Sequence, residues 1–354
     1  MFASKRASSA LLFVAATLAL PASAQDTVSF NYVGSWSGLG LFKEFEQPFW
    51  AEALPASSDG RIETQVTTFD QMGLKGGEVF RLLSRGVFDI GATVADYTVQ
   101  DAPELEGLDL PMLAPEAEQA FQVAKAYKPV LDDALQQRFN AKLLAVVPYP
   151  SQMLFCNAPI ESMADLDAKQ IRASGRSTAE FVEALGAEGI TMSFSEVPGA
   201  LERGVVDCAI TGSLSGYSAG WHEISTHLYP LPMGGWDHVV TAMNLDRWNE
   251  LDAELQAQIL SAVESQLETP VWRNAPAQTQ AGVGCLTGTE ACPYGEPGSM
   301  TPVVATEADF ERARQVLQQT LLPNWAGRVD ADWVARWNDT IGQVVDLQAD
   351  AAPE

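Results

Sequence analysis

Short apolar stretches alternate with longer amphipathic segments along the chain, a pattern typical of α/β folds in which helices cover strands. It predicts strands at 28–33, 63–69, 142–147, 152–156, 170–173 and 191–194. It predicts helices at 39–53, 116–139, 177–185, 245–269, 306–321 and 332–347, with Ser177 and Thr306 as N-terminal caps. The segment 270–302 is expected to be irregular, and the acidic tail 348–354 is expected to be loose.

Two stretches of the chain repeat one pattern. Leu83 to Thr93 and Leu201 to Thr211 share Leu, Arg, Gly, Val, Asp and Thr at matching positions. In both, a helical segment ends at a glycine, and a short strand of β-branched and apolar residues follows. Unless the similarity is a coincidence, the chain forms two similar α/β domains. Ligands bind beside the carboxyl ends of such strands, so Thr93, Val94 and Thr211 are expected to face a cleft.

The first residues have the features of an export signal. Lys5 and Arg6 are followed by an apolar stretch and by the small-residue sequence at 21–24. We interpret residues 1–24 as a signal peptide cleaved after Ala24, with an uncleaved membrane anchor as the alternative. No later stretch is long and apolar enough to predict a membrane span. The mature protein is then exported to an oxidising compartment in which disulfides form.

The charge balance is strongly acidic. The chain carries 46 acidic residues against 21 basic ones, a net charge of −25. Nucleic acids and anionic membranes attract basic surfaces, so neither is an expected partner. The sequence has no CxxC, HExxH or Walker-type motif, and its three histidines show no metal-ligand spacing. We therefore expect no metal and no cofactor.

The four cysteines fall into two sets. Cys285 and Cys292 lie close together, and a disulfide between them would close a small loop. Cys156 and Cys208 lie far apart, each in an apolar, strand-like stretch. These two either pair across neighbouring strands or remain as buried free thiols, and the sequence leaves both interpretations open.

One motif is shared with a class of hydrolases. Residues 216–220 match G-x-S-x-G, with Ser218 at the centre. A nucleophile elbow needs a strand that runs straight into the serine and a helix directly after it. Here the predicted strand ends near Thr211, and the last histidine, His238, follows too closely for the usual order of a triad. A secreted serine hydrolase is therefore only an alternative function.

One basic side chain stands out because the chain has so few of them. Arg172 lies within the predicted apolar strand 170–173, just before a turn of small residues. A guanidinium in that position presents a planar, two-pronged donor to a carboxylate. The alternative role is an ion pair with one of the protein's own acids.

Several short motifs occur together in this chain. They are Pro159-Ile160, 163–166, Ile171-Arg172, 194–197 and 200–207, preceded by Gly60-Arg61-Ile62, Gln71-Met72-Gly73 and 86–90. As a set they resemble the substrate-binding proteins of tripartite ATP-independent periplasmic (TRAP) transporters, the DctP-type family. The resemblance covers nearly all of the mature chain except 270–302.

The resemblance implies a two-domain α/β periplasmic binding protein with a hinge, a ligand cleft and a long helix that spans both domains. On this chain, domain I maps to 25–147 plus 237–275 and domain II to 148–236 plus 303–347. Residues 276–302 form an irregular, disulfide-containing segment between them. The implied partners are a small organic carboxylate and the TRAP membrane permease, and we expect a periplasmic monomer without enzymatic activity.

The resemblance also implies which residues bind the ligand. The family's strand arginine, which clamps the ligand carboxylate, falls on Arg172. A second arginine, which many dicarboxylate binders carry, is replaced by Gln152, and this favours one carboxylate beside a keto or hydroxyl oxygen. Some relatives hold a metal ion with an acidic and an aromatic residue at the end of this strand. This chain has Ile210 and Thr211 at those positions, so no metal is expected. The other expected ligand contacts are Ser35, Trp36, Tyr97, Phe194 and Trp236.

Taken together, the aromatic residues among these contacts favour a monocarboxylate with an apolar or aromatic body, such as a 2-oxo, 2-hydroxy or aromatic acid. Ordinary core packing is the alternative role for each of them. Two other functions stay open: the serine hydrolase with Ser218 as nucleophile, and a ligand-sensing protein that works without a permease.

Overall fold

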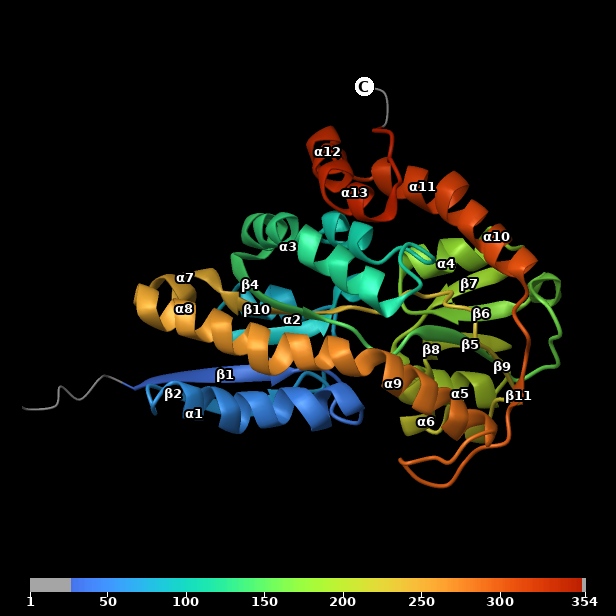
Figure 1. Cartoon of the computed structure of the whole chain (residues 1–354), viewed down its shortest axis with the longest axis horizontal. Coiled ribbons are helices and arrows are strands. Elements are labelled where there is room, and N and C mark those ends of the chain that lie inside the picture. Colours follow the sequence, from blue (N-terminus) through green and yellow to red (C-terminus); the bar gives the residue numbers. More distant parts are fainter. Residues whose placement is uncertain (1–26, 352–354) are drawn as a thin grey trace, which may run out of the picture.

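A computed structural model describes residues 27–351, so the predicted signal peptide at 1–24 lies outside the described residues. Two mixed β-sheets lie side by side, each surrounded by helices, and one long helix runs along both of them (Figure 1). We call each sheet with its surrounding helices a lobe. The ligand site expected from the sequence therefore has to be sought between the two lobes.

The first sheet has the order β2-β1-β3-β10-β4. Its strands are Val28–Gly34 (β1), Ile62–Thr68 (β2), Ile90–Val94 (β3), Ala141–Val147 (β4) and Val239–Asn244 (β10). β10 runs antiparallel to β3 and β4, whereas β1 is parallel to both of its neighbours. The carboxyl ends of β1 and β3 therefore point the same way, toward the second lobe (Figure 1).

The second sheet has the order β11-β9-β5-β8-β6-β7. Its strands are Gln152–Cys156 (β5), Gln170–Ala173 (β6), Glu188–Thr191 (β7), Cys208–Gly212 (β8), His227–Tyr229 (β9) and Thr301–Pro302 (β11). β5 runs antiparallel to β8 and β9, and β6 is parallel to β7 and β8. The predicted strands are confirmed, except that the one expected at 191–194 ends at Thr191.

Helical segments surround both sheets. Around the first they are Leu41–Glu46 (η1), Phe49–Ala53 (η2), Leu54–Ser57 (α1), Val79–Leu83 (α2), Ala95–Thr98 (η3), Pro103–Leu108 (η4), Ala117–Phe139 (α3) and Leu245–Asn249 (α7). Around the second they are Met163–Leu166 (η5), Arg176–Glu183 (α4), Phe194–Glu196 (η6), Val197–Glu202 (α5), Ser213–Ser218 (α6) and Trp221–Glu223 (η7).

The helix caps agree with the sequence at one of two positions. Thr306 caps its helix, with Asp309 completing a reciprocal capping box. Ser177 does not cap α4, because the helix already begins at Arg176 and Gly175 holds the N-cap position. The serine therefore lies within the first turn.

The long helix is continuous from Ala253 to Thr287 through α8 (Ala253–Ala262), η8 (Val263–Glu268) and α9 (Thr269–Thr287). The prediction of an irregular segment from 270 onward is therefore wrong up to the left-handed Gly288. A proline inside a helix costs about 3 kcal/mol, but Pro276 is tolerated because the helix packs along both lobes. Buried Trp272 fixes this part of it, with its indole nitrogen donating to the Val146 carbonyl at 2.9 Å.

The last helices bridge the two lobes. They are Glu307–Val316 (α10), Leu317–Leu321 (η9), Leu322–Ala326 (α11), Ala331–Asp339 (α12) and Ile341–Val345 (α13). η9 packs on α4 of the second lobe, whereas α12 and α13 pack on α3 of the first. Residues 303–347 were predicted to belong entirely to domain II. α12 and α13 instead pack on the first lobe. The other domain boundaries stay predictions.

The tail is also better held than the sequence predicts. The helix expected at 332–347 is divided at Thr340, whose backbone leaves the helical region. Beyond it, buried Ala349 exchanges two hydrogen bonds with the side chain of Asn338. The described part of 348–354 is thus attached to α12 rather than loose.

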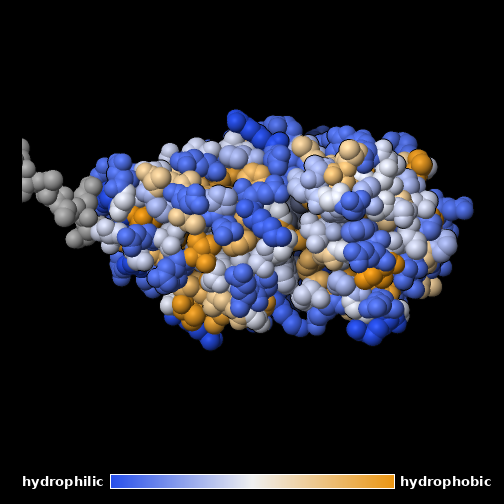
Figure 2. Space-filling model, turned by 90° about the horizontal axis from the view of Figure 1, so that it is seen from below, coloured by the Kyte–Doolittle hydropathy of each residue, from blue (hydrophilic) through white to orange (hydrophobic). Residues whose placement is uncertain are grey.

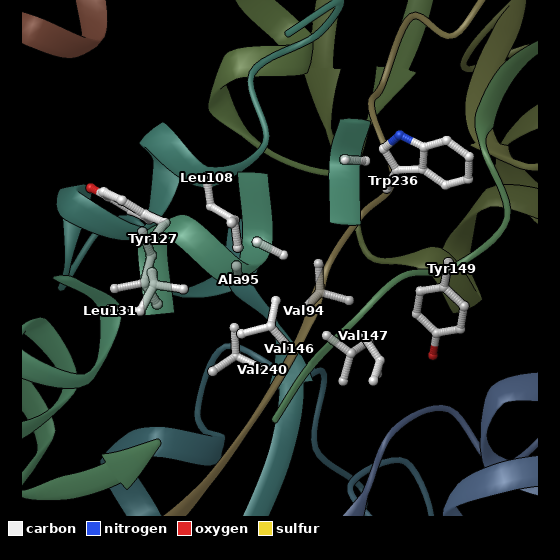
Figure 3. Close-up of a cluster of buried hydrophobic side chains, with 14 of the residues drawn as sticks. Val94, Ala95, Leu108, Tyr127, Leu131, Val146, Val147, Tyr149, Trp236 and Val240 are labelled. Carbon is white, nitrogen blue, oxygen red and sulfur yellow. The ribbon is translucent and has the colours of Figure 1, made fainter. Parts of the chain in front are cut away.

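The largest apolar cluster fills the first lobe and extends into the second. Figure 3 shows Val146 and Val240, from neighbouring strands of the first sheet, on the side of Leu131 and Tyr127 of α3, with Val94 farther from that helix. Tyr149 and Trp236 lie at one side of this cluster, in the two segments that connect the sheets (Figure 3). These connecting segments run side by side, because the Tyr149 amide donates to the Trp236 carbonyl at 3.0 Å.

Both disulfides that the sequence allowed are present. Cys156 and Cys208 face each other across β5 and β8 and are bonded, so the free-thiol alternative is wrong. Cys285 and Cys292 close the loop at the end of α9. Together they fasten the centre of the second sheet and the end of the long helix.

Hydrophilic side chains cover much of the face seen from below, and an indentation separates its two halves (Figure 2). Among the helices within residues 27–351, none combines the length and apolar character that a membrane crossing requires.

Candidate functional site

Arg172 lies in β6, between β7 and β8, with only 1% of its surface exposed. Its Nε donates to the Met192 carbonyl at 2.9 Å and its Nη1 to the Ile210 carbonyl at 2.7 Å. The guanidinium also lies 6.0 Å from the ring centre of Trp221. Its Nη2 is buried and has no hydrogen-bond partner among residues 27–351. The cation is therefore fixed by two carbonyls and retains a free donor.

A small cavity of about 10 Å³ lies between the lobes. It is lined by residues of both lobes and of the connecting segments: Trp36, Leu39, Tyr97, Tyr149, Gln152, Phe194, Thr211, Ser215 and Asp237. Five of the predicted ligand contacts thus come together here. Arg172 borders this group rather than lining the cavity itself. Burial raises the pKa values of Tyr97 and Asp237, and the nearby Arg172 charge reduces that increase only in part.

Aromatic side chains close the cavity from both lobes. Trp36 of the first lobe lies 5.6 Å from Phe194 of the second, measured between ring centres. The Trp36 indole nitrogen donates to the Tyr97 hydroxyl at 3.4 Å. Phe194 stacks on Trp221, the residue that also faces Arg172. The apolar wall therefore continues from the first lobe to the guanidinium.

Polar groups also line the cavity. Gln152 is 1% exposed, and its Nε2 donates to the Pro150 carbonyl at 3.0 Å. Its Oε1 is buried without a hydrogen-bond partner in the described part of the chain. Thr211 is buried on the neighbouring strand. The Gln152 Oε1 acceptor and the Thr211 hydroxyl are thus available at the cavity, and the free Arg172 Nη2 donor lies near them.

Two predicted contacts lie elsewhere. Ser35 is fully buried, and its backbone amide donates to Glu46 at 2.8 Å. Trp236 points into the core, because its indole nitrogen donates to the Ala114 carbonyl at 2.8 Å. Neither residue is among those that line the cavity. The sequence could place Trp236 in a connecting segment but could not determine the direction of its side chain.

The strand end of the first repeat also turns away from the cavity. The Thr93 hydroxyl donates to the Gly76 carbonyl at 2.9 Å, and Val94 packs in the core of the first lobe (Figure 3). The corresponding Thr211 of the second repeat does line the cavity. The two repeats therefore contribute unequally to the site.

Asp237 is the site residue that the sequence analysis missed. It lines the cavity in a left-handed backbone conformation with φ 48°. Burial raises its pKa to about 7, although the nearby Arg172 charge lowers it. The chain has 46 acidic residues, so one acid beside Trp236 carried no distinguishing signal in the sequence.

The hydrolase motif does not form an elbow. β8 ends at Gly212, and Ser218 is exposed at the last residue of α6. His222 stacks on Tyr217, whereas His238 is buried beside Asp109 in the first lobe. Within residues 27–351, no three or more His, Cys, Asp or Glu side chains are arranged to hold a metal ion.

Comparison with known proteins places this architecture in a family. The profile of the bacterial extracellular solute-binding proteins, family 7 (DctP), matches residues 42–281. The chain belongs to this family, the TRAP-type solute-binding proteins, as the sequence predicted.

Individual relatives are distant in sequence. The Salmonella typhimurium protein YiiZ is 26% identical over 266 residues, covering 72% of this chain and 78% of that protein. The ectoine-binding periplasmic protein TeaA of Halomonas elongata is 24% identical over 206 residues, covering 57% of this chain and 60% of TeaA.

A solved structure agrees in fold. DctP7 of Bordetella pertussis, an extracytoplasmic solute receptor binding pyroglutamic acid, has a TM-score of 0.76 to this chain. The two are 22% identical, and the match covers 89% of this chain and 99% of DctP7.

Proposed function

We propose that this protein captures a small organic monocarboxylate between its lobes and delivers it to a TRAP membrane permease. The observation that carries the proposal is the buried Arg172 guanidinium, which retains an unpaired donor near the small cavity between the lobes. A buried charge without a partner is costly, and a ligand carboxylate would supply that partner.

The closed lobes leave little empty space between them. The cavity of roughly 10 Å³ has room for about one water molecule, so a ligand enters only when the lobes move apart. The ligand carboxylate accepts from Arg172, Thr211 and Gln152 bond to neighbouring oxygens, and Trp36 and Phe194 cover the apolar body. Closure of the lobes then excludes water and strengthens the ion pair.

One carboxylate is favoured over two. Gln152 stands where a second cation would be needed, and Asp237 opposes a second negative charge. A 2-oxo, 2-hydroxy or aromatic acid satisfies these conditions. The pyroglutamic acid of DctP7 and the ectoine of TeaA are also small molecules with one carboxylate, so both belong in the first ligand screen.

The family supports an extracytoplasmic location and a transport role without catalysis. Export through a signal peptide cleaved after Ala24, a periplasmic location and a monomeric state are parts of the proposal. The permease subunits are its expected partners.

A ligand screen followed by calorimetry tests the proposal. Thermal shift with small carboxylates identifies a ligand, because binding to the native state raises the melting temperature. Affinity is then compared among the wild type, Arg172→Lys and Arg172→Ala. The alanine variant is expected to lose about 3–5 kcal/mol of binding free energy, the range for breaking a buried charge pair.

Arg85→Ala is the matched control, because it removes the same side chain at an exposed position. Arg85 lies in the first repeat, at the position that Arg203 has in the second. It should bind like the wild type. Circular dichroism of each variant separates a loss of binding from a loss of folding. Tight binding by a folded Arg172→Ala variant would remove Arg172 from the role proposed for it.

A further inference from the structure

Asp237 is held rigidly at the cavity by its surroundings. It belongs to the second connecting segment, in which the amides of Trp236 and His238 donate to Asp109 at 3.1 and 3.3 Å. A Cβ at Gly235 would come within 2.2 Å of the same Asp109 carboxylate, so the turn is tightly packed. The Asp237 side chain therefore faces the ligand space on a fixed support.

The charges around Asp237 do not neutralise it directly. No basic group of residues 27–351 lies within the 4.0 Å ion-pair distance of its carboxylate. Arg172 is near enough to lower its pKa, as are His238 and a hydrogen bond from Ser174, while Asp109 raises it. Burial is the largest effect and also raises the pKa. An acceptor group thus faces the cavity without a direct cationic partner.

A bound acid changes this balance. Once the ligand carboxylate pairs with Arg172, the negative charge of the ligand offsets the positive charge of Arg172. Asp237 then loses part of the favourable electrostatic effect of that arginine. Asp237 accepts one hydrogen bond from Ser174, and its remaining acceptor positions are then open to a donor of the ligand. A second carboxylate or an ether oxygen at that place would face it with like charge or with another acceptor.

We propose that Asp237 accepts a hydrogen bond from an N–H group of the ligand, so that the transported compounds are small acids that also carry a nitrogen donor. Lactam acids and cyclic amino acids belong to this class. The inference rests on the proposed function, since it assumes that the carboxylate end of the ligand is held by Arg172. It narrows the ligand from any monocarboxylate to one with a donor at the opposite end.

Pairs of compounds that differ in one atom test this class. L-Pyroglutamate is compared with 5-oxotetrahydrofuran-2-carboxylate, which exchanges a neutral N–H for oxygen, and L-proline with tetrahydrofuran-2-carboxylate, which exchanges a protonated amine for oxygen. We expect at least one nitrogen compound to raise the melting temperature and to bind at least about tenfold more tightly than its oxygen counterpart, because a bond to a charged group is lost.

Variants at the same position assign the preference to Asp237. Asp237→Asn removes the charge and Asp237→Gly removes the acceptor, and both residues tolerate the left-handed conformation. Each should weaken the nitrogen compound by about tenfold or more while changing the oxygen compound less. Asp346→Asn is the control, because Asp346 is exposed and also left-handed, with φ 54°.

The possible outcomes separate this inference from the proposed function. Equal binding of the paired compounds, or an unchanged preference in folded Asp237 variants, would overturn the role of Asp237. Binding of oxo or hydroxy acids with no nitrogen compound bound would overturn it as well, but would leave the Arg172 clamp intact. If no small carboxylate stabilises the protein, both proposals fail.

Discussion

The Ser174 hydroxyl donates a hydrogen bond to the Asp96 carboxylate at 3.2 Å, joining the second lobe to the first. The next residue, Gly175, is so close to Asp96 that a Cβ there would lie 2.1 Å from the carboxylate. At the outer edge, Lys75 and Glu196 form a second link, with 2.9 Å between Nζ and Oε1. The structure therefore shows the lobes closed against each other, with a close approach at Gly175.

A side chain at Gly175 should keep the lobes apart. Its φ is −152°, so a substitution introduces no backbone strain and acts only through the contact with Asp96. Gly175→Val is expected to weaken ligand binding by at least about tenfold, because the closed form becomes less populated. Gly38→Val is the control, since nothing lies within 4 Å of a Cβ at Gly38. Calorimetry gives the affinity, and small-angle X-ray scattering with saturating ligand gives the shape.

In that experiment the Gly175→Val protein should stay more extended than the wild type when ligand is added. A variant as compact as the wild type, with the same affinity, would show that Asp96 moves aside and that Gly175 does not limit closure.

Local patterns were sufficient for much of this fold. Strands such as 142–147 and 152–156 are apolar, bounded by turns and nearly fully buried, so their composition already identified them. The capping box of Thr306 uses only residues three positions apart. Arg172 could be selected because a cation in an apolar strand is rare, and the family resemblance then gave it a role.

Features that depend on distant contacts could not be predicted in this way. Pro270 and Pro276 indicate the end of a helix, but packing of Trp272 and its neighbours on both lobes outweighs that local preference. Asp237 reaches the cavity through a turn fixed by Asp109, which lies far away in the sequence. Trp236, its neighbour, turns into the core for the same reason. The direction of side chains in the connecting segments is decided by tertiary structure.

Gln152→Arg should shift the ligand preference toward dicarboxylates. The new guanidinium would lie on β5 beside the cavity, where it could pair with a second ligand carboxylate. Asp237 would compete for that cation, so the shift is expected to be larger when Asp237→Asn is added. Thermal-shift rankings of succinate against monocarboxylates measure the effect. Gln315→Arg adds the same charge at an exposed site and is the control; a ranking shared by all variants would contradict the prediction.

The two disulfides should contribute unequally to stability. The Cys156–Cys208 bond spans 52 residues of sequence and the Cys285–Cys292 bond only 7. Loop-closure entropy then gives about 4 kcal/mol for the first and about 2 kcal/mol for the second. Urea unfolding of the two Cys-to-Ala double variants under oxidising conditions measures both losses. A greater loss from removing the Cys285–Cys292 bond would show that local packing at the end of α9, rather than chain entropy, dominates.

Asp237 should lower the stability of the ligand-free protein at neutral and alkaline pH. Its pKa is raised from the ordinary 3.8 to about 7, so the folded state holds the proton more tightly than the unfolded state does. Asp237 therefore does not reduce the free energy of unfolding below pH 4, where it is protonated in both states. Its contribution lowers the free energy of unfolding progressively as the pH rises from 4 to 7. Asp237→Asn removes this cost and should gain roughly 2–4 kcal/mol of unfolding free energy at pH 8.

The gain should shrink steadily as the pH is lowered and disappear near pH 4. Glu46 titrates in both proteins and its effect cancels, whereas the Asp237 charge helps to raise the pKa of buried Asp96. The difference between wild type and variant therefore reports Asp237 together with its effect on Asp96. Urea unfolding at several pH values, with Asp346→Asn as control, provides the measurement. A gain at pH 8 accompanied by loss of binding to the nitrogen-containing acids would mean that the carboxylate is kept for the ligand at the expense of stability. A variant less stable than the wild type at pH 8 would instead show that Asp237 supports the turn itself.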